Sequence, residues 1–246
     1  MRKVVSISVF ATIVAFAIAC NQTNSEQKIE TSTTQQINVS NRSDSTVYQK
    51  AGVIKVRDPK AVMFGYRQPG DDIFEFTIDD VGKFTSHVCA GVISAFLLTQ
   101  QSLDLLYPGD ELPIRGQIGI VASDLTDHLE VAAYIVRASA HGEEETTGST
   151  AVDTTLRIGK GKVVLIFKRL DNGKMVKAVF DKTVLMQSDN MQKIQALKSK
   201  VMNGTASDVE KKEFAENVQK TIEKIIADTP EGLITITECT DYVFKE

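Results

Sequence analysis

The chain has 246 residues, of which 28 are basic and 32 are acidic, giving a net charge of −4. The basic residues are scattered rather than clustered, which argues against a nucleic-acid partner. Only three cysteines are present, so a disulfide-dense scaffold is excluded and apolar packing must hold the core together.

Residues 1–19 have the features of an export signal. Arg2 and Lys3 make a short basic start, and an apolar run then ends in small residues directly before Cys20. The run is shorter than the roughly 20 apolar residues that a membrane-spanning helix needs. The pattern predicts a lipoprotein signal peptide over residues 1–19. An ordinary signal peptide cut nearby and an uncleaved anchor are the alternatives.

A small residue before a cysteine that closes the apolar run resembles the lipobox of bacterial lipoproteins. In that motif the cysteine sulfur receives a lipid carrying fatty acids such as palmitate, so Cys20 is the predicted lipidation site. Ala17 stands where leucine is usual, and Asn21 rather than aspartate follows the cysteine. By resemblance to enterobacterial sorting, this favours the outer membrane. We therefore expect a lipid-anchored protein of the cell envelope, on either membrane face, with homo-oligomers left open.

Residues 20–46 are rich in Asn, Gln, Thr, Ser and Glu and contain no aromatic residue. Such a segment buries too little surface to offset the entropy cost of ordering, so a disordered tether is predicted. The remaining 200 or so residues have about the size of one domain with an appendage. We divide them into a core at residues 47–188 and a helical hairpin with a terminal strand at residues 189–246.

In chain order, residues 52–76 are extended and rich in turns, and Thr77 with Asp80 predicts a capped helix start. An apolar helix is expected over residues 90–107 and a strand over 114–121. Ser123 and Asp124 are the expected cap of the next helix, which runs to residue 136. Residues 141–155 are polar and acidic and are predicted to form an exposed loop.

The second half of the chain begins with a hairpin signal, Asp171-Asn172-Gly173 between the predicted strands 162–167 and 175–180. Two amphipathic helices follow at 190–201 and 208–227, the second started by Ser207 and Glu210, and an edge strand covers 233–237. The predicted fold class is α+β. It comprises a mixed, largely antiparallel sheet packed with helices, plus a carboxy-terminal helical hairpin.

His87 and Cys89 lie two residues apart at the predicted start of the 90–107 helix. Zinc accepts both ligand types, and a helix amino terminus favours the thiolate form of cysteine. His128 lies near the start of another helix that follows a predicted strand. The pattern therefore predicts a metal site formed by His87, Cys89 and His128, for zinc or another borderline divalent metal.

Asp124, Asp127, His141 or water could complete this site, and either aspartate could be the base of a metal-dependent hydrolase. Simpler interpretations are open as well. Cys89 could be an inert buried thiol or form a disulfide with Cys239, and Asp124 could be a plain helix cap.

The segment Phe84-Thr85-Ser86-His87-Val88-Cys89-Ala90-Gly91, followed by an apolar helix, resembles the FmdE family of formylmethanofuran dehydrogenase proteins. The family hallmark is His-Gly-His-x-Cys-Pro-Gly, and the likeness covers about residues 74–228. The resemblance implies metal binding at His87 and Cys89.

The match is partial, because Thr85, Ser86 and Ala90 replace the first histidine, the glycine and the proline of the hallmark. The family's downstream cysteines, near Thr126 and Leu156, are also missing. Members are named for an operon, so the resemblance implies no reaction and leaves open whether the chain is an enzyme. Our hypothesis is a membrane-anchored, zinc-binding protein of this family. The alternative is a metal-free, non-catalytic binding or scaffolding lipoprotein of the envelope.

Overall fold

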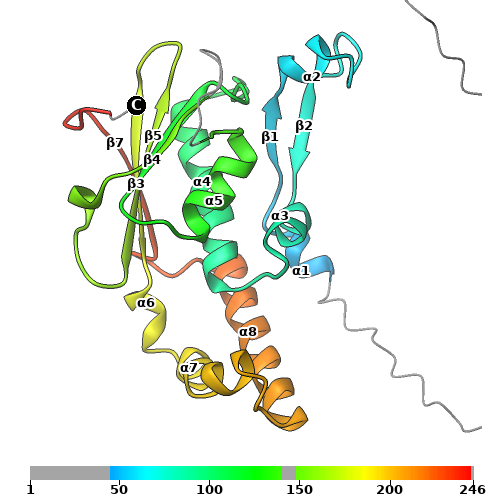
Figure 1. Ribbon diagram of the computed structural model, residues 1–246, viewed down its shortest axis with the longest axis vertical. Helices are drawn as coiled ribbons and strands as arrows, with labels where there is room; N and C mark the ends of the chain where they lie inside the picture. Colours follow the sequence, from blue (N-terminus) through cyan, green and yellow to red (C-terminus); the bar gives the residue numbers. More distant parts are fainter. Residues whose placement is uncertain (1–44, 140–147, 245–246) are drawn as a thin grey trace, which may run out of the picture. The chain divides into compact units, whose positions relative to one another are not determined.

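The computed structural model describes residues 45–139 and 148–244. It contains helices and two sheets with mostly antiparallel pairing, so the predicted α+β class is confirmed (Figure 1). None of the helices in these two ranges is long and apolar enough to cross a membrane. The predicted signal peptide, Cys20 and residues 20–44 of the predicted tether lie outside the described residues.

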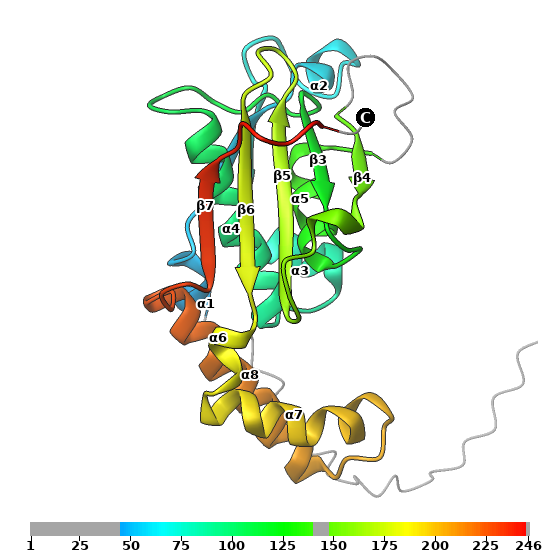
Figure 2. The ribbon, with the colours of Figure 1, turned by 90° about the vertical axis from the view of Figure 1, so that its left-hand side faces the viewer.

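The larger sheet has five strands in the order β4-β3-β5-β6-β7. The β3–β4 pair is parallel, and the other three described pairs are antiparallel. Figure 2 shows this sheet face-on, with helices behind it. The strands are β3 (Ile118–Ala122), β4 (Thr150–Val152), β5 (Lys162–Arg169), β6 (Met175–Asp181) and β7 (Ile234–Glu238).

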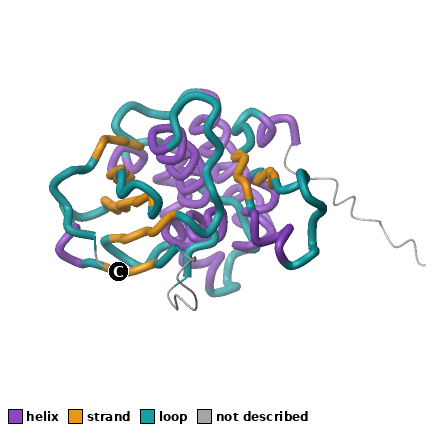
Figure 3. Tube along the Cα trace, turned by 90° about the horizontal axis from the view of Figure 1, so that it is seen from above, coloured by secondary structure: helices purple, strands orange, loops and turns teal. Residues whose placement is uncertain are grey.

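Two helices cover one face of this sheet, α4 (Ala90–Leu106) and α5 (Asp127–Val136). Figure 3 shows the helices on one side of the large sheet, between it and a two-stranded ribbon. Leu165 and Phe167 of β5 point into this helix-covered core and are fully buried. Burying each such side chain stabilises the fold by about 1.5–3 kcal/mol.

α4 is the central helix, since almost every residue from Val92 to Thr99 is buried. Two of its buried hydroxyl groups find partners inside the helix: Thr99 Oγ1 donates to the Ala95 carbonyl at 2.8 Å, and Ser102 Oγ donates to the Leu98 carbonyl at 2.7 Å. The sheet, α5 and the carboxy-terminal helix all pack against α4. The position of α4 is therefore fixed by packing on several sides.

The opposite face of the sheet carries a second, smaller apolar cluster. Val164, Ile166 and Cys239 are its buried members, and Tyr242 and Phe244 pack against it. Successive residues of β5 alternate between the two clusters, as the period of a strand requires. The large sheet is thus apolar on both faces around β5.

The two-stranded ribbon pairs β1 (Ile54–Arg57) with β2 (Ile73–Phe76). It is surrounded by the short helices α1 (Ser45–Gln49), α2 (Pro59–Met63) and α3 (Ile78–Thr85). The predicted cap of α3 is confirmed, because Thr77 and Asp80 form a capping box. α1 begins at Ser45, within the last two residues of the predicted tether.

The carboxy-terminal helical hairpin is also confirmed. It consists of α7 (Asp189–Met202) and α8 (Asp208–Ala227), preceded by the short α6 (Thr183–Met186). Ser207 and Glu210 form the expected capping box at the start of α8. The edge position of β7 is confirmed too, since this strand pairs with β6 alone among the described strands.

Three sequence-based expectations about the fold were wrong. Residues 52–76 were expected to be extended and rich in turns, but residues 59–63 form α2. Residues 141–155 were expected to be loop, but residues 150–152 form β4 and residues 154–156 a 3-10 helix. Three residues are too few to show a strand period. Ser123 and Asp124 do not cap α5, which begins at Asp127 after Thr126. Ser123 instead accepts a hydrogen bond from the backbone N–H of Val164 at 3.0 Å.

Replacing Ser207 with alanine should destabilise the helical hairpin, because the capping hydrogen bond to the Glu210 N–H is lost. We expect a decrease of about 1 kcal/mol in the free energy of unfolding, measured by urea denaturation with circular dichroism. Ser199→Ala, on the exposed surface of α7, is the matched control and should not destabilise. An equal loss in both variants would contradict the capping role.

The effect of Ser207→Ala should also depend on pH. Hydrogen bonds from Lys200 and from Ser207 lower the pKa of Glu210 from 4.5 to about 2. The stabilisation that the ionised Glu210 carboxylate provides is therefore fully present above pH 4.5 and is lost as the pH falls towards 2. The difference between wild type and variant should shrink over this range.

Candidate metal centre

The first two site residues lie in the turn between α3 and α4. Ser86 at the end of α3 is left-handed, with a φ of 63°, which redirects the chain towards α4. Cys89 is the amino-terminal cap residue of α4, and its side chain makes no capping hydrogen bond. The sulfur therefore lies at the positive end of a 17-residue helix.

The His87 ring is held by a backbone carbonyl. Its Nδ1 lies 2.9 Å from the carbonyl oxygen of Thr85. A carbonyl oxygen can only accept, so Nδ1 is the donor in this hydrogen bond and Nε2 is the ring nitrogen left for another partner. Histidines that ligate metals commonly donate their other ring N–H to a carbonyl in this way. The backbone thus orients His87 with Nε2 left for a metal ion.

The third group comes from the start of α5. Asp127 is the first residue of that helix and follows Thr126, whose side chain makes no capping hydrogen bond either. A Cβ placed on Gly91 of α4 would lie 3.6 Å from both Asp127 Oδ2 and Cys89 Sγ. Gly91 therefore lies within van der Waals reach of both ligand groups, at the first turn of α4.

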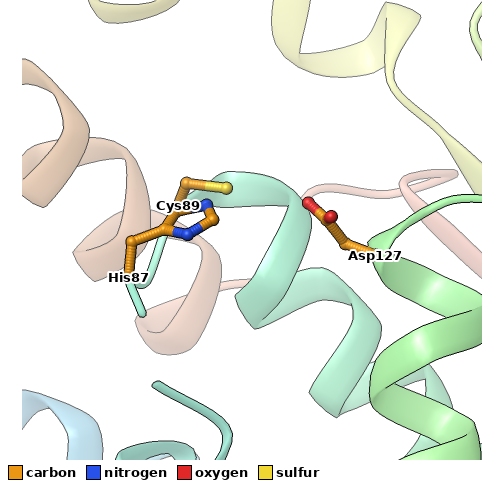
Figure 4. A group of neighbouring side chains, drawn as sticks. All are labelled: His87, Cys89 and Asp127. Carbon is orange, nitrogen blue, oxygen red and sulfur yellow. The ribbon is translucent and has the colours of Figure 1, made fainter. Parts of the chain in front are cut away.

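One ligand atom each from His87, Cys89 and Asp127 lies within 4.8 Å of the other two (Figure 4). Ligands of a tetrahedral zinc ion are about 3.3–3.8 Å apart, given zinc–ligand distances of about 2.0–2.3 Å. Small side-chain adjustments would complete such a geometry. The structure thus brings together two of the three predicted principal ligands and one of the predicted additional ligands.

His128 lies next to this group in sequence but is not part of it. Its side chain is buried, with 4% of the residue exposed, and its ring packs on Phe180 at a centroid distance of 4.3 Å. Burial lowers the pKa of His128 from 6.5 to about 4, so the imidazole is neutral at pH 7. Its Nε2 has no hydrogen-bond partner among the described residues.

Asp124, another of the predicted additional ligands, is already paired with a basic side chain. Asp124 forms an ion pair with Arg157, with Arg157 Nη2 at 2.5 Å, and the hydrogen bond from Arg157 lowers the pKa of this carboxyl group. A carboxylate held in this way is a weak candidate for a general base. His141 lies outside the described residues.

The predicted alternative of a disulfide between Cys89 and Cys239 was wrong, since both thiols are free. Cys239 belongs to the small cluster with Val164 and Ile166, whereas Cys89 packs against the main core. The large sheet separates these two clusters. Burial and the neighbouring Asp241 raise the pKa of the Cys239 thiol.

The candidate metal centre opens into a cleft of about 1120 Å³. The starts of α4 and α5 line one side, and the α7–α8 hairpin lines the other. Gly161 and Lys162 at the beginning of β5, and Phe180 at the end of β6, also line the cleft. The sequence predicted the hairpin but not that it would form a wall of the site.

Residues 84–235 match the family described as FmdE, molybdenum formylmethanofuran dehydrogenase operon. The chain belongs to the FmdE family. The FmdE match confirms the resemblance noted at residues 84–91 and includes His87, Cys89, Asp127 and the α7–α8 hairpin. No match was found among curated proteins.

Alkylation should distinguish the two thiols of this FmdE protein. We expect iodoacetamide to modify Cys89 well before Cys239, because Cys89 is half-buried at the cleft whereas Cys239 is buried and its thiol pKa is raised. Peptide mass spectrometry over a time course measures both rates. Equal rates would contradict the difference in burial between the two cysteines, and a mass that changes on reduction would show that they are not free thiols.

Proposed function

We propose that this FmdE-family protein binds one divalent metal ion, zinc, through His87, Cys89 and Asp127. The observation that carries the proposal is the convergence of one nitrogen, one sulfur and one oxygen ligand within 4.8 Å. Imidazole, thiolate and carboxylate are all zinc ligands. The family resemblance supports the proposal, because the two matched positions of the hallmark are His87 and Cys89.

The local structure supports the same assignment. The Thr85 carbonyl orients His87, and the cap position of α4 holds the Cys89 sulfur at the amino terminus of that helix, with no capping hydrogen bond of its own. Three protein ligands would leave a tetrahedral ion one further position, as in catalytic zinc sites. A zinc ion there would act as a Lewis acid on a bound oxygen atom. No particular reaction is assigned.

We also propose that Cys20 anchors the protein by lipid in the cell envelope, with the outer membrane favoured. The support is the sequence of residues 1–21: a basic start, a short apolar run, small residues and then Cys20 and Asn21. Anchoring would place the metal centre in an oxidising compartment. There, zinc would protect Cys89 from oxidation by occupying its sulfur.

The chain from Asn21 to the end includes every described element, and we call it the 21–246 chain. We expect it to hold about one zinc per molecule after dialysis against zinc, measured by elemental mass spectrometry. His87→Ala, Cys89→Ser and Asp127→Asn should each lower zinc affinity about tenfold or more, because each removes a ligand.

Matched controls separate ligation from general damage. Asp124→Asn removes a carboxylate that Arg157 already pairs, and Cys239→Ser removes the thiol on the other face of the sheet. Both should retain zinc. A metal-free wild-type chain, or equal losses in controls and ligand variants, would refute the metal proposal and favour the metal-free scaffolding alternative.

Lipidation has its own test in the full chain. Radioactive palmitate supplied to expressing bacteria should label the protein, and the label should fractionate with membranes. Cys20→Ser should abolish labelling, since the acceptor sulfur is lost, whereas Cys89→Ser should not. Labelling that survives Cys20→Ser would contradict the assignment.

A further inference from the structure

Two residues that line the cleft each have a buried polar atom without a hydrogen-bond partner within the described ranges. These atoms are Oγ1 of Thr126 and Nε2 of His128. Leaving a buried polar atom unpaired costs free energy, so most such atoms in proteins have partners. Two unpaired atoms on neighbouring residues of one cleft point to a ligand that pairs with them.

The same place is favourable for negative charge. α4 has 17 residues and α5 has 10, and the first residues of both helices line the cleft. Neither cap residue, Cys89 or Thr126, makes a side-chain capping hydrogen bond. Two helix amino termini therefore direct their partial positive charge and N–H groups towards one region.

Two lysines at the cleft add to this positive charge. Lys182 and Lys198 are exposed, line the cleft and form no ion pair with any described residue. Lys162, by contrast, is paired with Asp181 at 2.9 Å. The two unpaired lysines favour an anionic ligand over a neutral one.

The opposite wall of the cleft is apolar. It is formed by side chains of α6, α7 and α8, and a ligand with an apolar body would cover them. These side chains are Leu185, Met191, Ile194, Met202, Phe214 and Val218. Met202 is 66% exposed, so this wall still presents apolar surface to solvent. A volume of about 1120 Å³ is sufficient for a small organic molecule.

We infer that the cleft binds a small organic carboxylate with an apolar body. The carboxylate lies at the starts of α4 and α5, where Thr126 Oγ1 and His128 Nε2 donate hydrogen bonds to it. The apolar body lies against the apolar wall formed by α6, α7 and α8. The inference rests on the proposed function only in placing the carboxylate beside the metal ion. Asp127 also lines the cleft, so without an ion its carboxylate weakens the binding that Thr126, His128 and the helix starts provide.

Octanoate is the probe, and calorimetric titration of the 21–246 chain measures its affinity. We expect octanoate to bind about tenfold or more tightly than acetate, because acetate lacks the apolar body. Octanol has the same body without the charge and should bind about fivefold or more weakly than octanoate. Zinc content is measured on each sample.

Variants assign the binding to the cleft. Thr126→Val and His128→Leu should each weaken octanoate binding about fivefold without lowering the free energy of unfolding, because each removes a buried polar atom that is unpaired in the free protein. Thr99→Val is the matched control, since the Thr99 hydroxyl is paired within α4 away from the cleft. It should leave octanoate binding unchanged.

Charge at the rim is tested in the same way. Lys198→Glu should weaken octanoate binding about threefold. Lys193→Glu, also exposed on α7 but not lining the cleft, should change it less than about twofold.

The outcomes separate this inference from the metal proposal. Octanoate binding that depends on Thr126 and His128 supports the inference, even in a chain that holds no zinc. A zinc-loaded chain that binds octanoate no better than acetate or octanol overturns the inference and leaves the metal proposal standing. Binding that is insensitive to all three cleft variants overturns it as well.

Discussion

The burial of α4 is the constraint on which the rest of this protein depends. The helix lies against the large sheet, α5 and α8, and its residues from Val92 to Thr99 are almost all buried. A helix packed from several sides cannot shift without opening the core. Its amino terminus is therefore a fixed point, and Cys89 is placed there by the capping position alone.

The candidate metal centre and the cleft follow from a second helix start brought to the same point. α5 packs against α4 and delivers Asp127 opposite Cys89. Two helix amino termini side by side create an electrostatic environment that suits thiolate, carboxylate or a bound anion. The same arrangement leaves Thr126 and His128 with unpaired polar atoms. Stability is thus lower here than full hydrogen bonding would allow, which is common where a protein binds a ligand.

The large sheet separates the thiols of Cys89 and Cys239 and gives them different surroundings. Cys89 lies on the helix-covered side at the cleft, and Cys239 lies in the small cluster on the other face. In an oxidising envelope, as we propose, a pair of adjacent thiols would form a disulfide. Separation by the sheet keeps both thiols free and leaves the sulfur of Cys89 available to a metal ion.

Local features of this fold were determined by the sequence itself. The two capping boxes, at Thr77 and Ser207, and the Asp171-Asn172-Gly173 hairpin depend on residues only a few positions apart. The turn that carries His87 and Cys89 to a helix start is local in the same sense. Such features need no knowledge of distant contacts, so the α+β class and two of the three residues of the candidate metal centre, His87 and Cys89, could be predicted.

Only the tertiary structure decided which residue of α5 faces Cys89. Neighbouring residues of a helix point about 100° apart, so a start at Asp127 rather than near Asp124 directs Asp127 to the candidate metal centre and buries His128 beside Phe180. The separation of the two thiols and the use of the α7–α8 hairpin as a wall of the cleft were decided in the same way. All three depend on packing between segments far apart in the chain, which the pattern of residues along any one segment does not encode.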